Sequence, residues 1–189
     1  SAAMEAGRRC PGKFSYICLR DRIEDSQESP ELMQNMVVVN ENISFEALFE
    51  QVQDTFAVIL GWYADLQELV IKNCTLQEIV DASEPILKNY VQLTDYAFKL
   101  LAYTRNTDCD EPITVLAREF GYHPEETIKR FKKLNRMEAW ERSSGSLLVN
   151  DDHKLSKYTM VSKIFRFRGS YFAHAVMTCN TCPATDGLK

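Results

Sequence analysis

The chain has 189 residues, with 22 Lys and Arg against 27 Asp and Glu, so its formal net charge is −5. This length suits one ordinary domain with an extension, and 7 Gly with 6 Pro exclude a fibrous or largely disordered chain. The acidic balance disfavours duplex DNA as the main partner. No apolar run reaches the ~20 residues of a membrane span, so we expect a cytoplasmic protein without a membrane partner.

Residues 1–43 are predicted to be an N-terminal extension or the remnant of an upstream domain. The segments 14–19 and 36–39 are rich in β-branched and aromatic residues and are predicted strands, with a charged connection between them. Two strands do not form a stable unit alone. The sequence leaves open whether they also pair with the sheet of the main domain.

Residues 44–74 are predicted to form a long connecting helix, capped by Ser44 and with Glu46 in its first turn. Its apolar residues recur at alternating spacings of four and three, which is typical of a coiled-coil seam. A helix that lies on a core usually shows a wider stripe, and packing within the chain is the alternative. We predict a homodimer whose interface consists of Phe45, Phe49, Val52, Phe56, Ile59, Tyr63, Leu66 and Val70.

Residues 75–180 are predicted to form one α+β domain, and residues 181–189 a loose tail. Thr75 and Glu78 form a capping box at the start of a second helix. The helix is followed by strands at 90–94 and 98–103, helices at 112–120 and 124–138, and strands at 147–149, 158–168 and 171–179. Gly169 supplies a tight turn between the last two strands. This order predicts a five-stranded antiparallel sheet with crossover helices, as in GAF and PAS sensor domains.

Three stretches of this domain follow a pattern of core and turn residues that one family shares. They read LQEIVDASEPILKN at 76–89, VQLTD at 91–95 and LLAYT at 100–104. They resemble the sensory region of PucR-type bacterial transcription factors, which include purine-catabolism and sugar-diacid regulators. The similarity extends over residues 44–180, although Lys88, Tyr90 and Ala175 depart from the family's usual Gly, Pro and Gly. The resemblance implies a ligand-sensing and dimerisation fragment, with the DNA-binding domain outside these 189 residues.

A ligand pocket is expected between the sheet and the crossover helices. His174 shares an apolar strand face with Phe172 and Val176, where its ring needs a hydrogen-bond partner, either a ligand or a neighbouring side chain. We expect a small organic effector at Tyr103, Tyr122, His123, Trp140, Tyr158 and His174. The same aromatic residues also suit an ordinary core, so a purely dimerising scaffold without a ligand is an alternative.

A second alternative is direct DNA binding through residues 114–134. Ala117, Gly121 and a basic second helix resemble a helix-turn-helix, with the charges supplied by Lys129, Arg130, Lys132 and Lys133. Against this interpretation, Thr127 occupies the position of the usual apolar anchor. A basic cluster of this kind also occurs on any solvated helix face.

The sequence gives no positive sign of an enzyme or of a metal site. It lacks the GxSxG, P-loop, HExxH and GxGxxG motifs, so we expect no catalysis. Its 6 cysteines are scattered, which favours free thiols over a disulfide framework. Cys179 and Cys182 form a single CxxC pair, whereas a structural zinc site needs a second one, so we expect neither metal nor cofactor.

Overall fold

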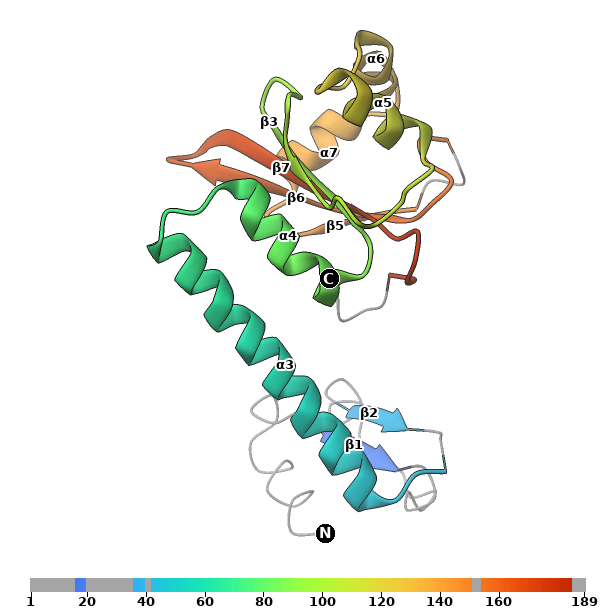
Figure 1. Cartoon of the computed structure of the whole chain (residues 1–189). Coiled ribbons are helices and arrows are strands. Elements are labelled where there is room, and N and C mark those ends of the chain that lie inside the picture. The colour runs from blue at the N-terminus through green and yellow to red at the C-terminus, as the bar shows by residue number, and fades with distance from the viewer. Residues whose placement is uncertain (1–15, 20–35, 40–41, 151–153, 185–189) are drawn as a thin grey trace. The chain divides into compact units, whose positions relative to one another are not determined.

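The structure, a computed structural model, describes residues 16–19, 36–39, 42–150 and 154–184. The chain divides into two compact units, Ser1–Val58 and Ile59–Lys189. In chain order the elements (Figure 1) are β1 (Tyr16–Leu19), β2 (Met36–Val39), α3 (Phe45–Ile71), α4 (Leu76–Leu87), β3 (Tyr90–Asp95), β4 (Leu100–Tyr103), α5 (Pro112–Phe120), α6 (Glu125–Lys133), α7 (Arg136–Arg142), β5 (Leu147–Val149), β6 (Met160–Phe167) and β7 (Ser170–Thr178). In the described ranges, no helix is both long and apolar enough to cross a membrane.

The first unit contains a small parallel sheet made of β1 and β2. The two strands pair along their whole length, from Tyr16 opposite Met36 to Leu19 opposite Val39. The sequence left open whether these strands join the main sheet. They do not, because the five-stranded sheet consists of β3 to β7. Residues 14 and 15, which belong to the predicted first strand, lie outside the described residues.

α3 is a helix of 27 residues with none of its side chains buried. Ser44 caps it, because the Ser44 hydroxyl accepts a hydrogen bond from the Ala47 N–H at 3.1 Å. Six of the eight residues of the predicted seam are exposed, and the other two, Val52 and Leu66, are half-buried. The helix therefore turns its regular apolar pattern towards solvent within a single chain.

α4 begins with the predicted capping box, which the structure confirms. The Thr75 hydroxyl accepts from the Glu78 N–H at 3.2 Å, and the Glu78 carboxylate accepts from the Thr75 N–H at 2.7 Å. The helix ends at Lys88, which has a left-handed backbone with φ 54°.

Asn89 fastens the start of β3 to the segment that follows β7. Its side-chain nitrogen donates to the carbonyl of Cys182 at 3.0 Å. Its side-chain oxygen accepts from the N–H groups of Thr181 and Cys182 at 3.0 and 2.9 Å. Next to it, the Tyr90 N–H donates to the side-chain oxygen of Asn180 at 3.0 Å. The chain thus enters and leaves the sheet at one point.

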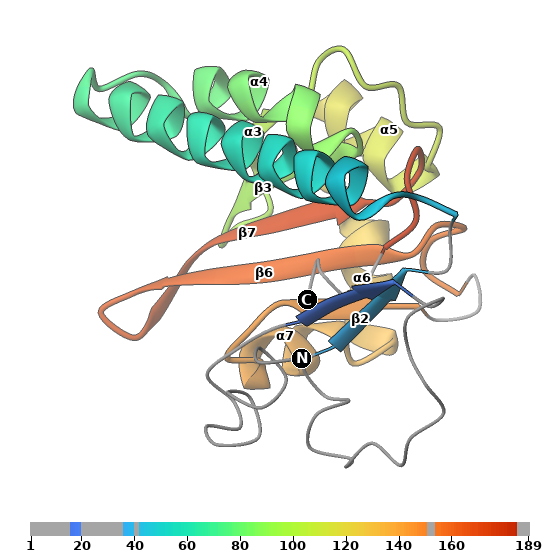
Figure 2. The ribbon, with the colours of Figure 1, turned by 90° about the horizontal axis from the view of Figure 1, so that it is seen from below.

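The main sheet confirms the predicted α+β class and the five antiparallel strands. Its strand order is β4-β3-β7-β6-β5, and every neighbouring pair is antiparallel. A tight turn joins β6 and β7 as predicted, but it lies at Arg168 and Gly169, with φ 52° and 82°, one residue earlier than the predicted turn at Gly169 and Ser170. β4 is shorter than predicted, because Phe98 has φ 64° and belongs to the turn after β3. Figure 2 shows β3, β7 and β6 side by side.

The helices between β4 and β5 differ in one respect from the prediction. One helix was expected over residues 124–138, but α6 and α7 are separate helices. The break occurs because Asn135 takes a left-handed conformation with φ 54°, which an L-residue in a helix cannot keep. In Figure 1, α5 and α6 lie above the strands and α4 lies below them. The core between the upper helices and the sheet consists of Phe98, Ile113, Phe131, Trp140 and Leu155.

Candidate functional site

Three neighbouring strands bring polar side chains together on one face of the sheet. Gln92 of β3 and Ser162 of β6 both lie opposite Val176 of β7. Because successive strand residues point to opposite faces, His174 and Thr178 share the face of Val176. These four polar residues are each at most 4% exposed. The sheet therefore presents a polar band to the interior of the domain.

Two side chains from the helical segment cover this band. His123 lies in the turn between α5 and α6, and its backbone N–H donates to the carbonyl of Phe98 at 2.9 Å, which fixes the turn against the sheet. Trp140 lies in α7, with its ring centroid 4.4 Å from that of His174. Both covering side chains are buried.

A cavity of about 30 Å³ lies between the band and its cover. Apolar side chains complete its walls, among them Phe98, Phe131, Met160 and Val176. A water molecule needs roughly 10–15 Å³ when volume is measured in this way. The cavity therefore has room for two or three waters, or for a molecule of a few heavy atoms.

Gln92 and His123 form a hydrogen-bonded pair at the cavity, with 3.0 Å between Gln92 Nε2 and His123 Nε2. In this orientation the amide donates, so the neutral His123 ring carries its proton on Nδ1. With the amide turned over, the Gln92 oxygen accepts from Nε2–H instead. As the amide lies, Gln92 Oε1 is an unused acceptor and His123 Nδ1–H an unused donor, and both are buried without a partner. With the amide turned over, its nitrogen becomes the unused donor and Nδ1 the unused acceptor.

Three further residues that line the cavity also have a buried polar atom without a partner. These atoms are Trp140 Nε1, Ser162 Oγ and His174 Nε2. An unsatisfied buried polar atom costs about 1–3 kcal/mol, and native domains contain few of them. Five such atoms on residues around one small cavity are unusual.

The two histidines are uncharged at neutral pH. Burial lowers the pKa of His123 to about 4. Burial, together with the nearby His123, lowers the pKa of His174 to about 4. Among the residues the structure describes, Glu111 is the one carboxylate that lines the cavity. Its Oε2 accepts from the Ser156 hydroxyl at 2.8 Å and from the Lys157 N–H at 2.9 Å.

The structure brings together three of the six residues predicted for the ligand site. His123, Trp140 and His174 line the cavity. The other three lie elsewhere: Tyr122 is exposed, the Tyr158 hydroxyl donates to Asp110 at 2.8 Å, and the Tyr103 ring lies beside that of Tyr90.

Sequence reasoning missed Gln92, Glu111, Ser162 and Thr178, which also line the cavity. Gln92 and Ser162 each follow an apolar residue in a strand, and a polar residue at an alternate position normally indicates a solvent-facing side. Only the register of β3, β7 and β6 shows that these positions point inward.

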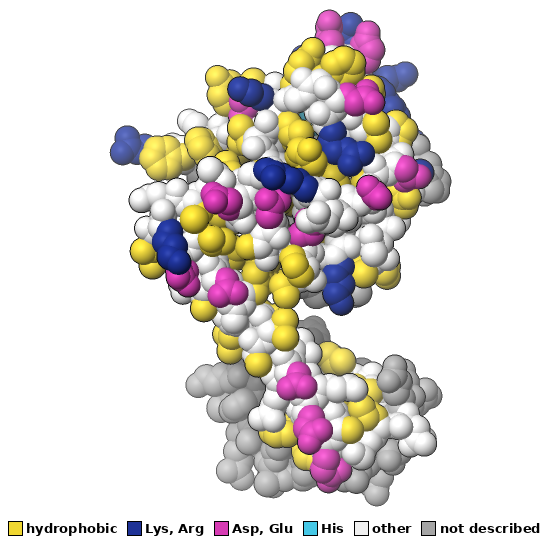
Figure 3. All heavy atoms as spheres, viewed as in Figure 1, with side chains coloured by type: hydrophobic (Ala, Val, Ile, Leu, Met, Phe, Trp, Pro, Cys, Tyr) yellow, Lys and Arg dark blue, Asp and Glu magenta, His cyan; other side chains and the backbone are white. Residues whose placement is uncertain are grey.

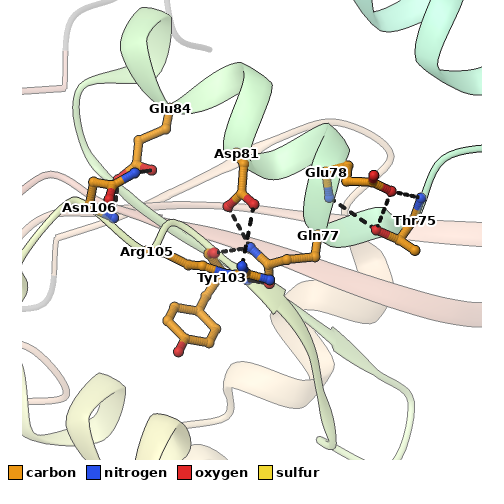
Figure 4. Close-up of polar contacts among 8 residues, drawn as sticks. All are labelled: Thr75, Gln77, Glu78, Asp81, Glu84, Tyr103, Arg105 and Asn106. Atoms are coloured by element: carbon orange, nitrogen blue, oxygen red, sulfur yellow. Dashed lines mark hydrogen bonds and ion pairs between the residues drawn. The ribbon is translucent and has the colours of Figure 1, made fainter.

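A second group of contacts joins α4 to the edge of the sheet beside the cavity (Figure 4). The Gln77 amide donates to the Tyr103 carbonyl at 2.6 Å and accepts from the Tyr103 N–H at 3.2 Å. It thereby covers the open edge of β4, much as another strand would. Tyr103 is the register partner of Gln92. Tyr103 thus lies between α4 and Gln92, whose side chain lines the cavity.

Glu84 provides a further attachment of α4 to the loop after β4. Its carboxylate accepts from the Asn106 N–H at 2.8 Å and from the Asn106 side chain at 3.1 Å (Figure 4). It also accepts from the Thr107 hydroxyl at 2.6 Å. Glu84 is buried. Movement of α4 would therefore pull on both β4 and the loop that follows it.

The basic residues of the predicted helix-turn-helix lie on α6. Lys129 pairs with Glu125 at 2.9 Å, and Arg130 donates to the carbonyl of Lys154 at 2.8 Å. Lys132 and Lys133 are exposed. The first turn of α6 carries Glu125 and Glu126, which are also exposed.

Within the described ranges, Cys74, Cys109, Cys179 and Cys182 are free thiols. No group of three or more His, Cys, Asp or Glu side chains in those ranges is arranged to hold a metal ion. A scan against models of known protein families finds none that matches this chain, and a search of curated proteins finds no matching relative.

Proposed function

We propose that this chain is the ligand-sensing and dimerisation part of a bacterial transcription regulator of PucR type. A small organic effector binds in the cavity under α5, α6 and α7. DNA is bound by a part of the protein outside residues 1–189, in the cytoplasm. The observation that carries the proposal is the convergence of five unpartnered buried polar atoms on residues around one cavity.

The topology of the sheet supports a sensor domain of the GAF and PAS kind. Numbered along the chain from β3, the strands lie in the order second, first, fifth, fourth, third. The three helices α5, α6 and α7 form the crossover between the second and third strands. Such an arrangement leaves space for a ligand between the sheet and the crossover helices.

The exposed seam of α3 supports dimerisation with a second copy. The helix has five acidic residues and no basic one: Glu46, Glu50, Asp54, Asp65 and Glu68. The acidic side chains visible in Figure 3 form a row along the helix. At 100° per residue, this row lies on the side opposite the seam. Two copies can therefore join their apolar seams while their acidic rows stay apart in solvent.

The contacts of α4 support a connection between ligand binding in the cavity and dimerisation through α3. α4 follows directly after α3, and its Gln77 holds Tyr103, the register partner of Gln92 in the cavity. A ligand that binds one arrangement of β3 and β4 more tightly than another would change the position of α4, and through it the pairing of α3.

A thermal-shift screen tests the sensor function. Purines, allantoin-like compounds, sugar acids and aromatic acids are added to the wild-type chain and to His174→Phe, in which a larger apolar ring occupies the cavity. An effector should raise the melting temperature of the wild type and of the control Tyr122→Phe, but not of His174→Phe. Stabilisation that is equal in all three chains, or none in any, would reject the proposal.

Direct DNA binding is the second candidate, and the observation that favours it is the pair α5 and α6 joined by a short turn at Gly121. The acidic Glu125 and Glu126 argue against it, because the first turn of a recognition helix faces the DNA. An electrophoretic shift with mixed duplex DNA at low salt distinguishes the two functions. Retardation that is lost in Lys132→Glu/Lys133→Glu would favour DNA binding.

A further inference from the structure

The hydrogen-bonding groups around the cavity define what a bound molecule must offer. Trp140 Nε1–H can only donate. The Gln92–His123 pair leaves one donor and one acceptor, whichever way the amide lies. Ser162 Oγ can donate and accept, and His174 Nε2 does one or the other, depending on its tautomer. A molecule that satisfies these groups must therefore carry both a donor and an acceptor.

The charges around the cavity restrict the molecule further. None of the described residues that line it is Lys or Arg, and the two histidines His123 and His174 are neutral. A buried carboxylate would lie near Glu111 without a positive partner, which is unfavourable. Of the described lining residues, only Glu111 could pair with a cation, and its Oε2 already accepts two hydrogen bonds.

The size of the cavity, about 30 Å³, limits the part of the molecule that enters it to a few heavy atoms. We infer that the cavity binds an uncharged group with a donor and an acceptor side by side, as in a primary amide or a urea. This inference rests on the proposed function, because it presupposes that the cavity is a ligand site. If the cavity binds an uncharged group, the carboxylate of a sugar acid or of any other acid does not enter it.

The test uses three molecules of nearly equal shape that differ in charge: acetamide (neutral), acetate (negative) and acetamidinium (positive). Each is titrated to millimolar concentrations, as suits so small a ligand, into the ¹⁵N-labelled chain. The indole N–H peaks of Trp62 and Trp140 are recorded, and Trp62→Phe identifies which is which. Trp62 is an internal control, because its Nε1 donates to Ser83 Oγ at 3.3 Å and does not line the cavity.

We expect acetamide to move the Trp140 peak and to leave the Trp62 peak in place, while acetate and acetamidinium move neither. If either ion moves the Trp140 peak as far as acetamide does, the inference on charge is wrong, although the cavity remains a ligand site. In a second outcome, acetamide has no effect, but a compound from the thermal-shift screen stabilises the wild type and not His174→Phe. The inferred chemical class of the ligand is then wrong, and the proposed function stands. If the screen is also silent, the cavity holds nothing larger than water and both fail.

Gln92→Met provides the matched test of the hydrogen-bonding argument. It keeps the length of the side chain and removes its donor and acceptor, so acetamide binding should weaken about fivefold or more, as for the loss of one or more hydrogen bonds. The control Gln51→Met makes the same change at an exposed position of α3 and should leave binding unchanged. Equal binding by Gln92→Met and the wild type would overturn the assignment of Gln92 to the ligand. A dispersed Trp140 peak in Gln92→Met shows that the variant is folded.

Discussion

The cavity and the seam of α3 depart from the usual distribution of side chains in opposite directions. At the cavity, polar groups lie inside the domain without partners, whereas along α3 apolar groups lie outside it. Both arrangements cost free energy in an isolated chain. Local departures of this kind concentrate at functional sites, and for this reason we propose a protein partner for the exposed seam and a small molecule for the cavity.

The largest effect should come from a charge placed in the seam. Phe56→Asp puts one carboxylate into each half of a symmetric interface, and we expect it to raise the dimer dissociation constant about 1,000-fold, or about 4 kcal/mol. Ala57→Asp adds the same charge one residue away, off the seam, and should have little effect. Analytical ultracentrifugation measures both variants. Equal dimerisation of the two would show that α3 does not pair through this face.

Acid should destabilise the folded chain through the two histidines of the cavity. Their pKa values are about 4 when folded, against about 6.5 in an unfolded chain. Between these values the unfolded chain binds more protons, so the free energy of unfolding falls as the pH decreases from about 6.5 to about 4, by about 3 kcal/mol for each ring. Above that window the rings have no effect on the pH dependence.

Urea unfolding at a series of pH values measures this effect. His174→Asn removes one ring and keeps every carboxylate, so the difference between its pH profile and that of the wild type isolates His174. The profile of the variant should be clearly flatter below about pH 6.5. Parallel profiles would mean that His174 is not buried as a neutral ring.

A smaller effect is expected where α4 meets the sheet. Gln77→Glu keeps the acceptor for the Tyr103 N–H but loses the bonds donated to the Tyr103 carbonyl and to Asp81, and adds a charge beside Asp81. We expect a loss of about 1–2 kcal/mol in unfolding free energy. The same change at exposed Gln51 should cost less than about 0.5 kcal/mol. If Gln77→Glu is equally harmless, Gln77 does not hold the edge of β4.

The smallest effects on the free energy of unfolding are expected when two buried serines are each replaced by alanine. Ser162→Ala removes an unpaired hydroxyl and should raise the free energy of unfolding by about 1 kcal/mol. Ser156→Ala removes a hydroxyl that donates to Glu111 and accepts from the Tyr158 N–H, and should lower it by about 1–2 kcal/mol. Chemical unfolding should therefore give opposite signs for one and the same substitution. A loss in both variants would show that Ser162 has a partner when folded.

Much of the fold could be predicted because its signals are local. The capping box at Thr75 and the turn at Gly169 each depend on a few adjacent residues, and both are present. The break between α6 and α7 could not be predicted in this way. Leu134 and Met137 continue the apolar spacing across it, and the left-handed backbone of Asn135 overrides that pattern.

The candidate site was predictable only in part, because it depends on register. His174 could be found because strand alternation places it on the same face as Phe172 and Val176. Gln92 and Ser162 could not, since each shows the alternation of a strand with one side in water. Tyr122 lies in the same short turn as His123, but adjacent residues point in different directions, and the Tyr122 ring is exposed.

Asn89 has a mechanical consequence. Its three hydrogen bonds to Thr181 and Cys182 close a loop of the chain whose two ends are 93 residues apart in sequence. A force applied between α4 and the chain after Cys182 would act first on these three hydrogen bonds, before it separates any strands of the sheet. Tension along the chain would therefore act on the hydrogen bonds of Asn89, whereas a displacement of α4 would act on β4 through Gln77.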